Sequence, residues 1–156
     1  MSTVHYQLWE YNDWANTVYL KLFESYGEKV PASALRFLGH IMNAQTIWLS
    51  RIEGDPQSVE PWTEHHRLEE IRTMHEKTSL GLRTAIVRHQ DNLSLKIRYT
   101  NTKGTAFQNT LSDILLQAFN HGTYHRAQIA LELRAHGLEA VNTDFINFIR
   151  LSAPQQ

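Results

Sequence analysis

Residues 115–133, LLQAFNHGTYHRAQIALEL, carry the pattern that decides the fold. Apolar residues recur there every three or four positions, which is the spacing of one face of an α-helix. At about 100° per residue, one side of this helix carries Ile114, Ala118, Gly122, His125 and Ile129. His121 lies at the edge of the same side, and Gln128 lies just beyond it. We therefore predict a helix in which both histidines face the interior of a helical protein.

Three further helices are predicted before this segment, over residues 4–26, 33–53 and 63–90. Each repeats apolar residues at helical spacing, and three of the four prolines fall between them. Ser33 is the expected N-cap of the second helix. The predicted apolar faces run through Tyr11, Trp14, Ala15, Val18 and Leu22, through Phe37, Ile41, Ala44, Trp48 and Ile52, and through Leu68, Ile71, His75, Thr78, Leu82 and Ile86.

After the third predicted helix, the period of the pattern changes to two, which is typical of a half-buried strand. NTKG at 101–104 favours a turn, and TAFQNT at 105–110 can return as the second strand of a hairpin. The alternating apolar residues of the first strand are Leu93, Leu95, Ile97 and Tyr99.

The helix with the histidine pair is expected over residues 112–136. Thr110 or Ser112 can cap its start, and the His-Gly pair at 136–137 is typical of a helix end. A short helix over 142–150, with Thr143 as its expected cap, completes the set.

Together these elements predict a mostly all-α protein. Its fold class is a four-helix bundle with a small β-hairpin inserted between the third and fourth long helices. A chain of 156 residues normally forms one hydrophobic core, so we expect a single domain over residues 1–156.

Composition excludes several classes of function. The formal net charge of −1 argues against nucleic-acid binding, which needs a basic surface. The absence of cysteine excludes disulfides, thiolate metal sites and a cysteine nucleophile. No apolar run approaches the roughly 20 residues of a membrane helix, and the first residues do not resemble a signal peptide. We expect a soluble, cytoplasmic protein.

The histidine pair has two explanations. Buried imidazoles need partners for both ring nitrogens, and a divalent metal supplies one partner to each ring. His40, at the margin of the second helix's apolar face, can add a third ligand, as in catalytic zinc sites. Core histidines satisfied by hydrogen bonds alone are the alternative, and His75 fits that description as well. Five other histidines are expected at the surface: His5, His65, His66, His89 and His136.

Gly122 lies between the paired histidines. Metalloproteases of the HExxH type carry their general base, a glutamate, at this position, so a peptidase is excluded. A glycine in mid-helix costs about 1 kcal/mol relative to alanine. Its presence favours either a close helix contact or room beside a metal.

The chain resembles the DinB-like (YfiT-like) family. The resemblance spans nearly the whole length and rests on YNDWAN, LGHIMNAQTIWLSRI, the hairpin with Gly104, ILLQAFNHGTYHRAQIALELRAHG and TDFINFI. Its most specific part is the NHxxxHRxQI core. The resemblance implies a four-helix bundle with one divalent metal, commonly zinc or nickel, held by three histidines that match His40, His121 and His125. It also matches Arg126, as a structural or interface residue, and Gln128, as a polar residue lining the site.

Family members of known activity include thiol-dependent S-transferases and a thiol-dependent isomerase. The resemblance thus implies a metal-dependent enzyme that transfers a low-molecular-weight thiol to an electrophilic small molecule, in detoxification or stress response. A hydrolase that uses a metal-activated water and a non-enzymatic metal or small-molecule binder are the alternatives. The candidates for catalytic or lining roles are Gln128, His75, Tyr124 and Trp48. For His75, the alternatives in order of preference are a core residue, a general base and a fourth ligand.

The resemblance also implies a homodimer. Trp9 and Phe23 are left over from the predicted apolar face of the first helix, which favours an exposed apolar surface there. No nucleic-acid or membrane partner is expected.

Overall fold

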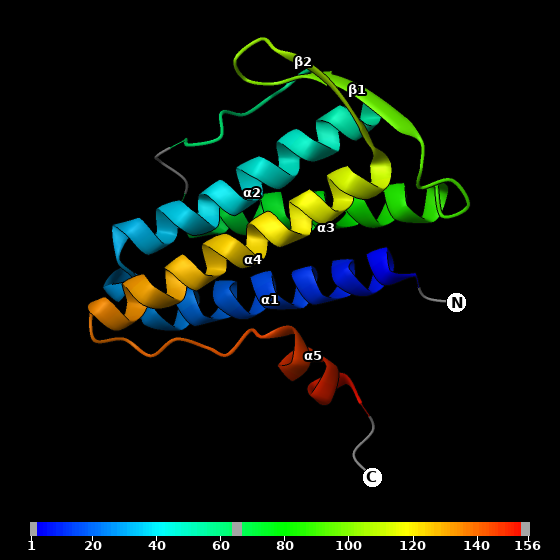
Figure 1. Cartoon of the computed structure of the whole chain (residues 1–156). Helices are drawn as coiled ribbons and strands as arrows, with labels where there is room; N and C mark the ends of the chain where they lie inside the picture. Colours follow the sequence, from blue (N-terminus) through cyan, green and yellow to red (C-terminus); the bar gives the residue numbers. More distant parts are fainter. Residues whose placement is uncertain (1–2, 64–66, 154–156) are drawn as a thin grey trace.

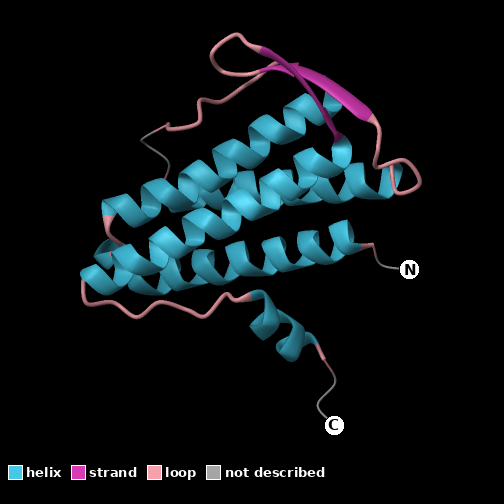
Figure 2. Cartoon of the chain, viewed as in Figure 1, coloured by secondary structure: helices cyan, strands magenta, loops and turns pink. Residues whose placement is uncertain are grey.

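The computed structural model describes residues 3–63 and 67–153. It confirms the predicted order of four long helices with a hairpin between the third and fourth (Figures 1 and 2). No helix in these two ranges is long and apolar enough to cross a membrane. The elements are α1 (Val4–Tyr26), the 3-10 helix η1 (Gly27–Lys29), α2 (Ala32–Glu53), α3 (Leu68–Arg88), β1 (Lys96–Thr100), β2 (Ala106–Thr110), α4 (Leu111–Ala135) and α5 (Phe145–Ser152).

Two clusters of buried apolar side chains hold the bundle together. One joins α1, α2, α3 and the C-terminal part of α4, and the other joins α3, the N-terminal part of α4 and the hairpin side of the bundle. On α4 the first cluster contributes Ile129 and Leu133, and the second contributes Leu111, Leu115 and Phe119. His121 and His125 lie between the two clusters, so apolar packing fixes α4 on both sides of the histidine pair.

Local hydrogen bonds explain where α4 and α2 begin. The Thr110 hydroxyl accepts from the Asp113 amide at 3.0 Å, and the Asp113 carboxylate accepts from the Thr110 amide at 3.0 Å. This capping box identifies Thr110, of the two predicted caps, as the N-cap of α4. The predicted Ser33 cap is wrong, because Pro31 occupies the N-cap of α2 and the Ser33 hydroxyl donates to Glu132 on α4 at 2.6 Å.

The ends of two other helices differ from the prediction. The α3 helix begins at Leu68 and not at residue 63, with Arg67 and Glu70 capping its first turn. Asp144, not Thr143, stands at the N-cap of α5. The Thr143 carbonyl instead accepts a hydrogen bond of 2.7 Å from the Tyr11 hydroxyl, which ties the approach to α5 onto α1.

The predicted apolar face of α1 is rotated relative to the observed one. Tyr19, Leu20 and Phe23 are buried, whereas Val18 and Leu22 are only half-buried. Phe23 is fully buried, so it contributes nothing to an exposed apolar surface. Trp9 is half-buried, and its indole N–H donates to the Ser79 carbonyl at 2.8 Å.

The hairpin pairs β1 with β2 in antiparallel register and turns at Gly104, whose φ is +83°. Backbone pairing continues past the strands, because the Leu111 amide donates to the Leu95 carbonyl at 2.8 Å and the Ser112 amide to the Leu93 carbonyl at 2.9 Å. The hairpin therefore fixes the first turn of α4 directly.

Gly122 marks a close contact of α4 with α1 and α2. Its neighbour Arg126 is 1% exposed and donates from Nη1 to the side-chain carbonyls of Asn12 (3.2 Å) and Asn16 (2.8 Å). Gln45 also donates to the Asn12 carbonyl, at 3.0 Å. A methyl group at position 122 would lie 2.9 Å from Arg126 Nη1 and 3.0 Å from Asn12 Oδ1. Of the two predicted explanations, the structure favours a close helix contact, made here by a buried polar network.

Replacing Gly122 with alanine is therefore expected to destabilise the protein despite alanine's higher helix propensity. Overpacking costs about 1–3 kcal/mol, and the gain in helix propensity offsets about 1 kcal/mol of that. We expect a net loss of about 1 kcal/mol in the free energy of unfolding, measured by urea denaturation. The cost should shrink in an Asn12→Ala background, where one of the crowding atoms is gone; equal costs in both backgrounds would contradict the contact.

Candidate metal centre

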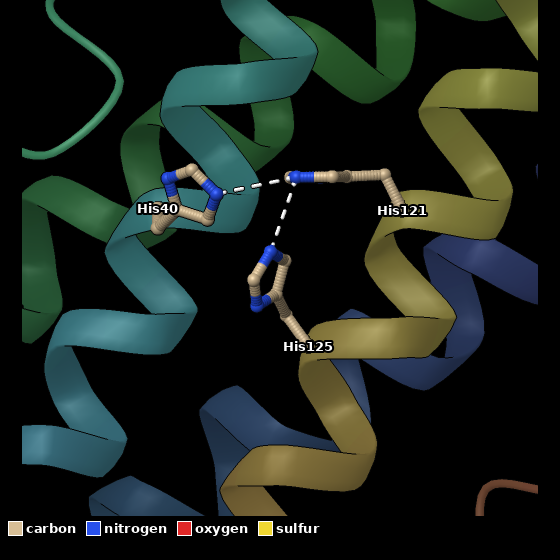
Figure 3. A group of neighbouring side chains, drawn as sticks. All are labelled: His40, His121 and His125. Carbon is tan, nitrogen blue, oxygen red and sulfur yellow. Dashed lines mark hydrogen bonds between the residues drawn. The ribbon is translucent and has the colours of Figure 1, made fainter.

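Three histidines from two helices converge between α2 and α4 (Figure 3). His40 extends from α2, and His121 and His125 extend from successive turns of α4. The Nε2 atom of His121 lies 3.2 Å from Nε2 of His40 and 3.1 Å from Nε2 of His125. His40 and His125 are 6% exposed, and His121 is partly buried. The predicted pair and the predicted third residue thus form one cluster.

Two of the rings are held in orientation by oxygen atoms that accept hydrogen bonds from their Nδ1 atoms. His40 Nδ1 lies 2.6 Å from the Pro61 carbonyl, and His125 Nδ1 lies 2.5 Å from Gln128 Oε1. An oxygen acceptor requires the proton on Nδ1, so the Nε2 atom of each neutral ring carries a lone pair directed at His121. This arrangement, with Nδ1–H on an oxygen and Nε2 free, is usual for histidines that bind metals.

Hydrogen bonds between the three rings cannot provide every Nε2 atom with a partner. His121 Nε2 has at most one proton, which can serve only one of its two close nitrogen neighbours. The Nε2 lone pair of the remaining ring would then lie about 3 Å from His121 Nε2 without a proton to accept, and a shared cation would satisfy it. Ligand nitrogens about 2.0–2.1 Å from an ion, at angles of 90–109°, are separated by about 2.8–3.4 Å. The two observed separations fall in this range, so the three residues fit a divalent ion.

Burial keeps the three rings neutral. It is the main cause that lowers the pKa of His121 to about 4, with smaller contributions from His125 and His40. Burial also lowers the pKa of His40 and of His125. His121 Nδ1 is buried and has no hydrogen-bond partner among the described residues. Neutral imidazole is the form that binds metals, so the site is prepared for an ion at neutral pH.

Aromatic side chains enclose the cluster. The Trp62 indole stacks on His40, with ring centroids 3.5 Å apart and an angle of 3°, and Phe37 stacks on His125 at 5.8 Å. Trp62 is 41% exposed, and the Arg36 guanidinium lies 5.1 Å from its ring. Pro61 and Trp62 belong to the α2–α3 loop and were not predicted as site residues. The loop carries no periodic pattern that places it over His40.

The other predicted site residues are dispersed. Gln128 is in the cluster through its bond to His125. Tyr124 is 63% exposed and contacts the edge of His125, with ring centroids 5.0 Å apart. Trp48 packs against Tyr99 on the hairpin, at 5.4 Å between centroids, and not on the histidines.

His75 is a core residue at a different place. It is 4% exposed and faces α1, where Nε2 lies 3.3 Å from Asp13 Oδ1 and 3.3 Å from the Thr17 hydroxyl. The cluster of potential ligands does not include it, so the interpretation of His75 as a fourth ligand is not supported.

The histidines expected at the surface vary in exposure. His136 is exposed and His89 is half-buried, whereas His65 and His66 lie outside the described residues. His5 is half-buried, and its Nε2 lies 2.9 Å from the Ser112 hydroxyl.

Substitution of Gln128 by alanine tests its role in orienting His125. Without the Oε1 acceptor, the His125 ring can take the other tautomer or rotate. We expect metal affinity to fall about 10- to 100-fold, the usual cost of losing such a partner, when measured by competition with a chromogenic chelator. Gln128→Glu keeps an oxygen acceptor and should retain most of the affinity. Equal losses in both variants would contradict this role.

The sequence of the chain is similar to those of known proteins over nearly its whole length. Residues 1–156 match the model of the DinB family. The chain is also 27% identical over 163 residues to Protein DinB of Bacillus subtilis (strain 168), and the match covers 93% of each chain.

Proposed function

Because the chain belongs to the DinB family, we propose that it is a divalent-metal-dependent enzyme that transfers a low-molecular-weight thiol to an electrophilic small molecule. The observation that supports this most is the convergence of three neutral imidazole nitrogens, two of them on rings whose orientation is fixed by oxygen acceptors. Zinc and nickel are among the ions that imidazole ligands suit. We place the reaction in the cytoplasm, where thiols are kept reduced.

A divalent ion in this site would lower the pKa of a thiol or a water molecule that it binds. The ligands themselves enhance this effect. Neutral imidazoles add no negative charge, so the site would keep the full positive charge of the ion. Three ligands also leave positions open for a substrate, as in catalytic zinc sites. The thiol must be a second substrate, because the chain has no cysteine.

The residues around the cluster favour a thiol over water as the nucleophile. Among the described residues, the cluster of potential ligands contains no carboxylate that could act within it as a general base for water. A thiol loses its proton near pH 8.5, whereas bulk water does so near 15.7, so a thiol needs far less assistance. In the transfer, sulfur bonds to the electrophilic carbon, the leaving group departs with its bonding electrons, and the thiol proton passes to solvent.

The side chains beside the cluster suggest how the electrophile is held. Trp62 is partly exposed and stacked on His40, and Tyr124 is exposed beside His125. Both offer flat apolar surfaces next to the proposed open positions. We expect them to contact the organic part of the electrophile.

The proposal is tested with metal-loaded protein, a panel of low-molecular-weight thiols and a chromogenic aryl halide. Thiol-dependent release of halide should occur above the uncatalysed rate and should disappear with a chelator. Return of zinc or nickel should restore it. A rate that is the same with and without the chelator would contradict the proposal. Metal-dependent ester hydrolysis without thiol would instead favour the hydrolase.

A further inference from the structure

A groove of about 620 Å³ lies between α4, α1 and the start of α5. Its apolar lining comes from all three helices: Leu8 and Tyr11 on α1, Leu116 and Phe119 on α4, and Phe145 on α5. Small-molecule sites have volumes of about 300–1,000 Å³ and are lined mainly by apolar and aromatic side chains. None of the three clustered histidines is among the described residues that line the groove, so it is separate from the candidate metal centre.

The start of α5 forms one wall of this groove. Figure 1 shows α5 lying beside α1 at the edge of the bundle. The Tyr11 hydroxyl donates to the Thr143 carbonyl at 2.7 Å, and the Phe145 ring packs edge-on against the Tyr11 ring, with centroids 5.3 Å apart. These two contacts hold Asp144, the residue between Thr143 and Phe145, close to α1. The wall of the groove is therefore fixed at the point where Asp144 lies.

The charged side chains of the groove are acidic. Asp113 and Asp144 line it, and none of the described lining residues is a lysine or an arginine. Asp144 occupies the N-cap of α5, yet its carboxylate forms no hydrogen bond or salt bridge with a described residue. Hydrogen bonds with Thr110 are the main cause that lowers the pKa of Asp113, with a smaller contribution from Lys96 outside the groove. Both carboxylates therefore carry their charge at neutral pH, and the lining has a net negative charge.

An apolar groove with a net negative charge suits a ligand that is itself apolar and positively charged. We propose that this groove binds organic cations, namely small amines or ammonium compounds with an aromatic or aliphatic body. The body would lie on Leu116 and Phe145, which are 40% and 39% exposed. The ammonium group would donate to the Asp144 carboxylate, in a hydrogen bond strengthened by both charges. An anion of the same shape would be repelled by both carboxylates, and a neutral analogue would lack the ion pair.

Three probes that share a naphthalene body test the proposal: naphthylethylamine is a cation, naphthylethanol is neutral and naphthylacetate is an anion. Isothermal titration calorimetry measures their binding to the full chain, as purified and again with a chelator. The amine should bind at least about fivefold more tightly than the alcohol, and the acetate more weakly than the alcohol. High salt should reduce these differences, because it screens the carboxylates. The chelator should leave the affinity for the amine unchanged, since the groove is separate from the metal centre.

Amide hydrogen exchange locates the bound amine. The helix α5 contains no fully buried residue, so its amides should exchange readily in the free protein. An amine that contacts Phe145 and Asp144 ties α5 to α1 and α4. At about ten times the dissociation constant of the amine, exchange in α5 should slow by at least about threefold. Slower exchange in the α2–α3 loop with no change in α5 would place the amine at the histidine cluster and overturn the proposal.

Two substitutions separate the charge of the groove from its apolar surface. Asp144→Asn removes the charge and keeps a good N-cap residue, so the advantage of the amine over the alcohol should fall to about twofold or less. Leu116→Ala should weaken amine and alcohol alike by at least about threefold. Leu80→Ala is the matched control at an exposed leucine of α3, outside the groove, and should change neither. An amine that binds no more tightly than the acetate, an unchanged advantage in Asp144→Asn, loss of amine binding with the chelator, or equal losses in both leucine variants would each overturn the proposal.

Discussion

Replacement of His121 by alanine is expected to remove most of the bound metal from purified protein. His121 is the central ring of the cluster, since its Nε2 atom is the close neighbour of both other Nε2 atoms. Its removal leaves two ligands. Loss of a residue that only orients a ligand lowers metal affinity by up to about 100-fold, and loss of a ligand itself should lower it further. Elemental analysis after gel filtration should find about one ion per chain in the unmodified protein and less than a tenth of that in the variant.

The control for this experiment is His136→Ala, which also removes one imidazole from the C-terminal half of the chain. His136 is exposed and lies outside the cluster, so its loss should leave metal content unchanged. Circular dichroism should confirm that both variants remain helical. Unchanged metal content in the His121 variant would mean that the ion, if any, binds elsewhere. If the metal is lost as expected, thiol transfer should also be lost in the His121 variant and kept in the His136 variant.

The part of the site that could be predicted from sequence is the part that depends on helix geometry. Spacing of four on one helix places His121 and His125 on the same face whatever the rest of the chain does. His40 could be added because it lies at the margin of another apolar face. The Pro61 carbonyl and Trp62 could not be found in this way. They reach His40 from a loop about 20 residues further on, and a loop without periodicity carries no signal for where it lies.

The fold, too, could be predicted where it depends on local pattern and not where it depends on tertiary contacts. The helices and the hairpin follow from local pattern, but the buried face of α1 does not. This helix packs against the bundle and also against α5, where Tyr11 contacts Phe145 and Trp14 contacts Phe148. A helix with apolar neighbours on more than one side has no single apolar stripe, so the predicted face was rotated. The caps of α2 and α5 were displaced for a related reason: tertiary contacts occupy Ser33 and the Thr143 carbonyl.

Acidification is expected to release the metal and to destabilise the metal-free protein over the same pH range. Burial is the main cause that lowers the pKa of His121 to about 4, and burial also lowers those of His40 and His125. In the unfolded chain, each imidazole titrates near pH 6.5. Between about pH 6.5 and pH 4, the unfolded chain therefore binds more protons than the folded one. The free energy of unfolding must then fall as the pH falls, while above pH 6.5 this contribution is fully present.

Thermal unfolding between pH 7.5 and pH 4, with and without one equivalent of zinc, measures both effects. Bound zinc should raise the melting temperature at neutral pH, because only the folded chain presents the assembled site. Protons compete with the ion as the rings titrate, so this increment should shrink as the pH falls toward 4. In the metal-free state, His121→Ala should show a shallower decline in stability than the unmodified protein, because it lacks the ring with the most lowered pKa. A zinc increment of the same size at pH 7.5 and at pH 4 would contradict three imidazole ligands, since a protonated imidazole cannot coordinate a metal.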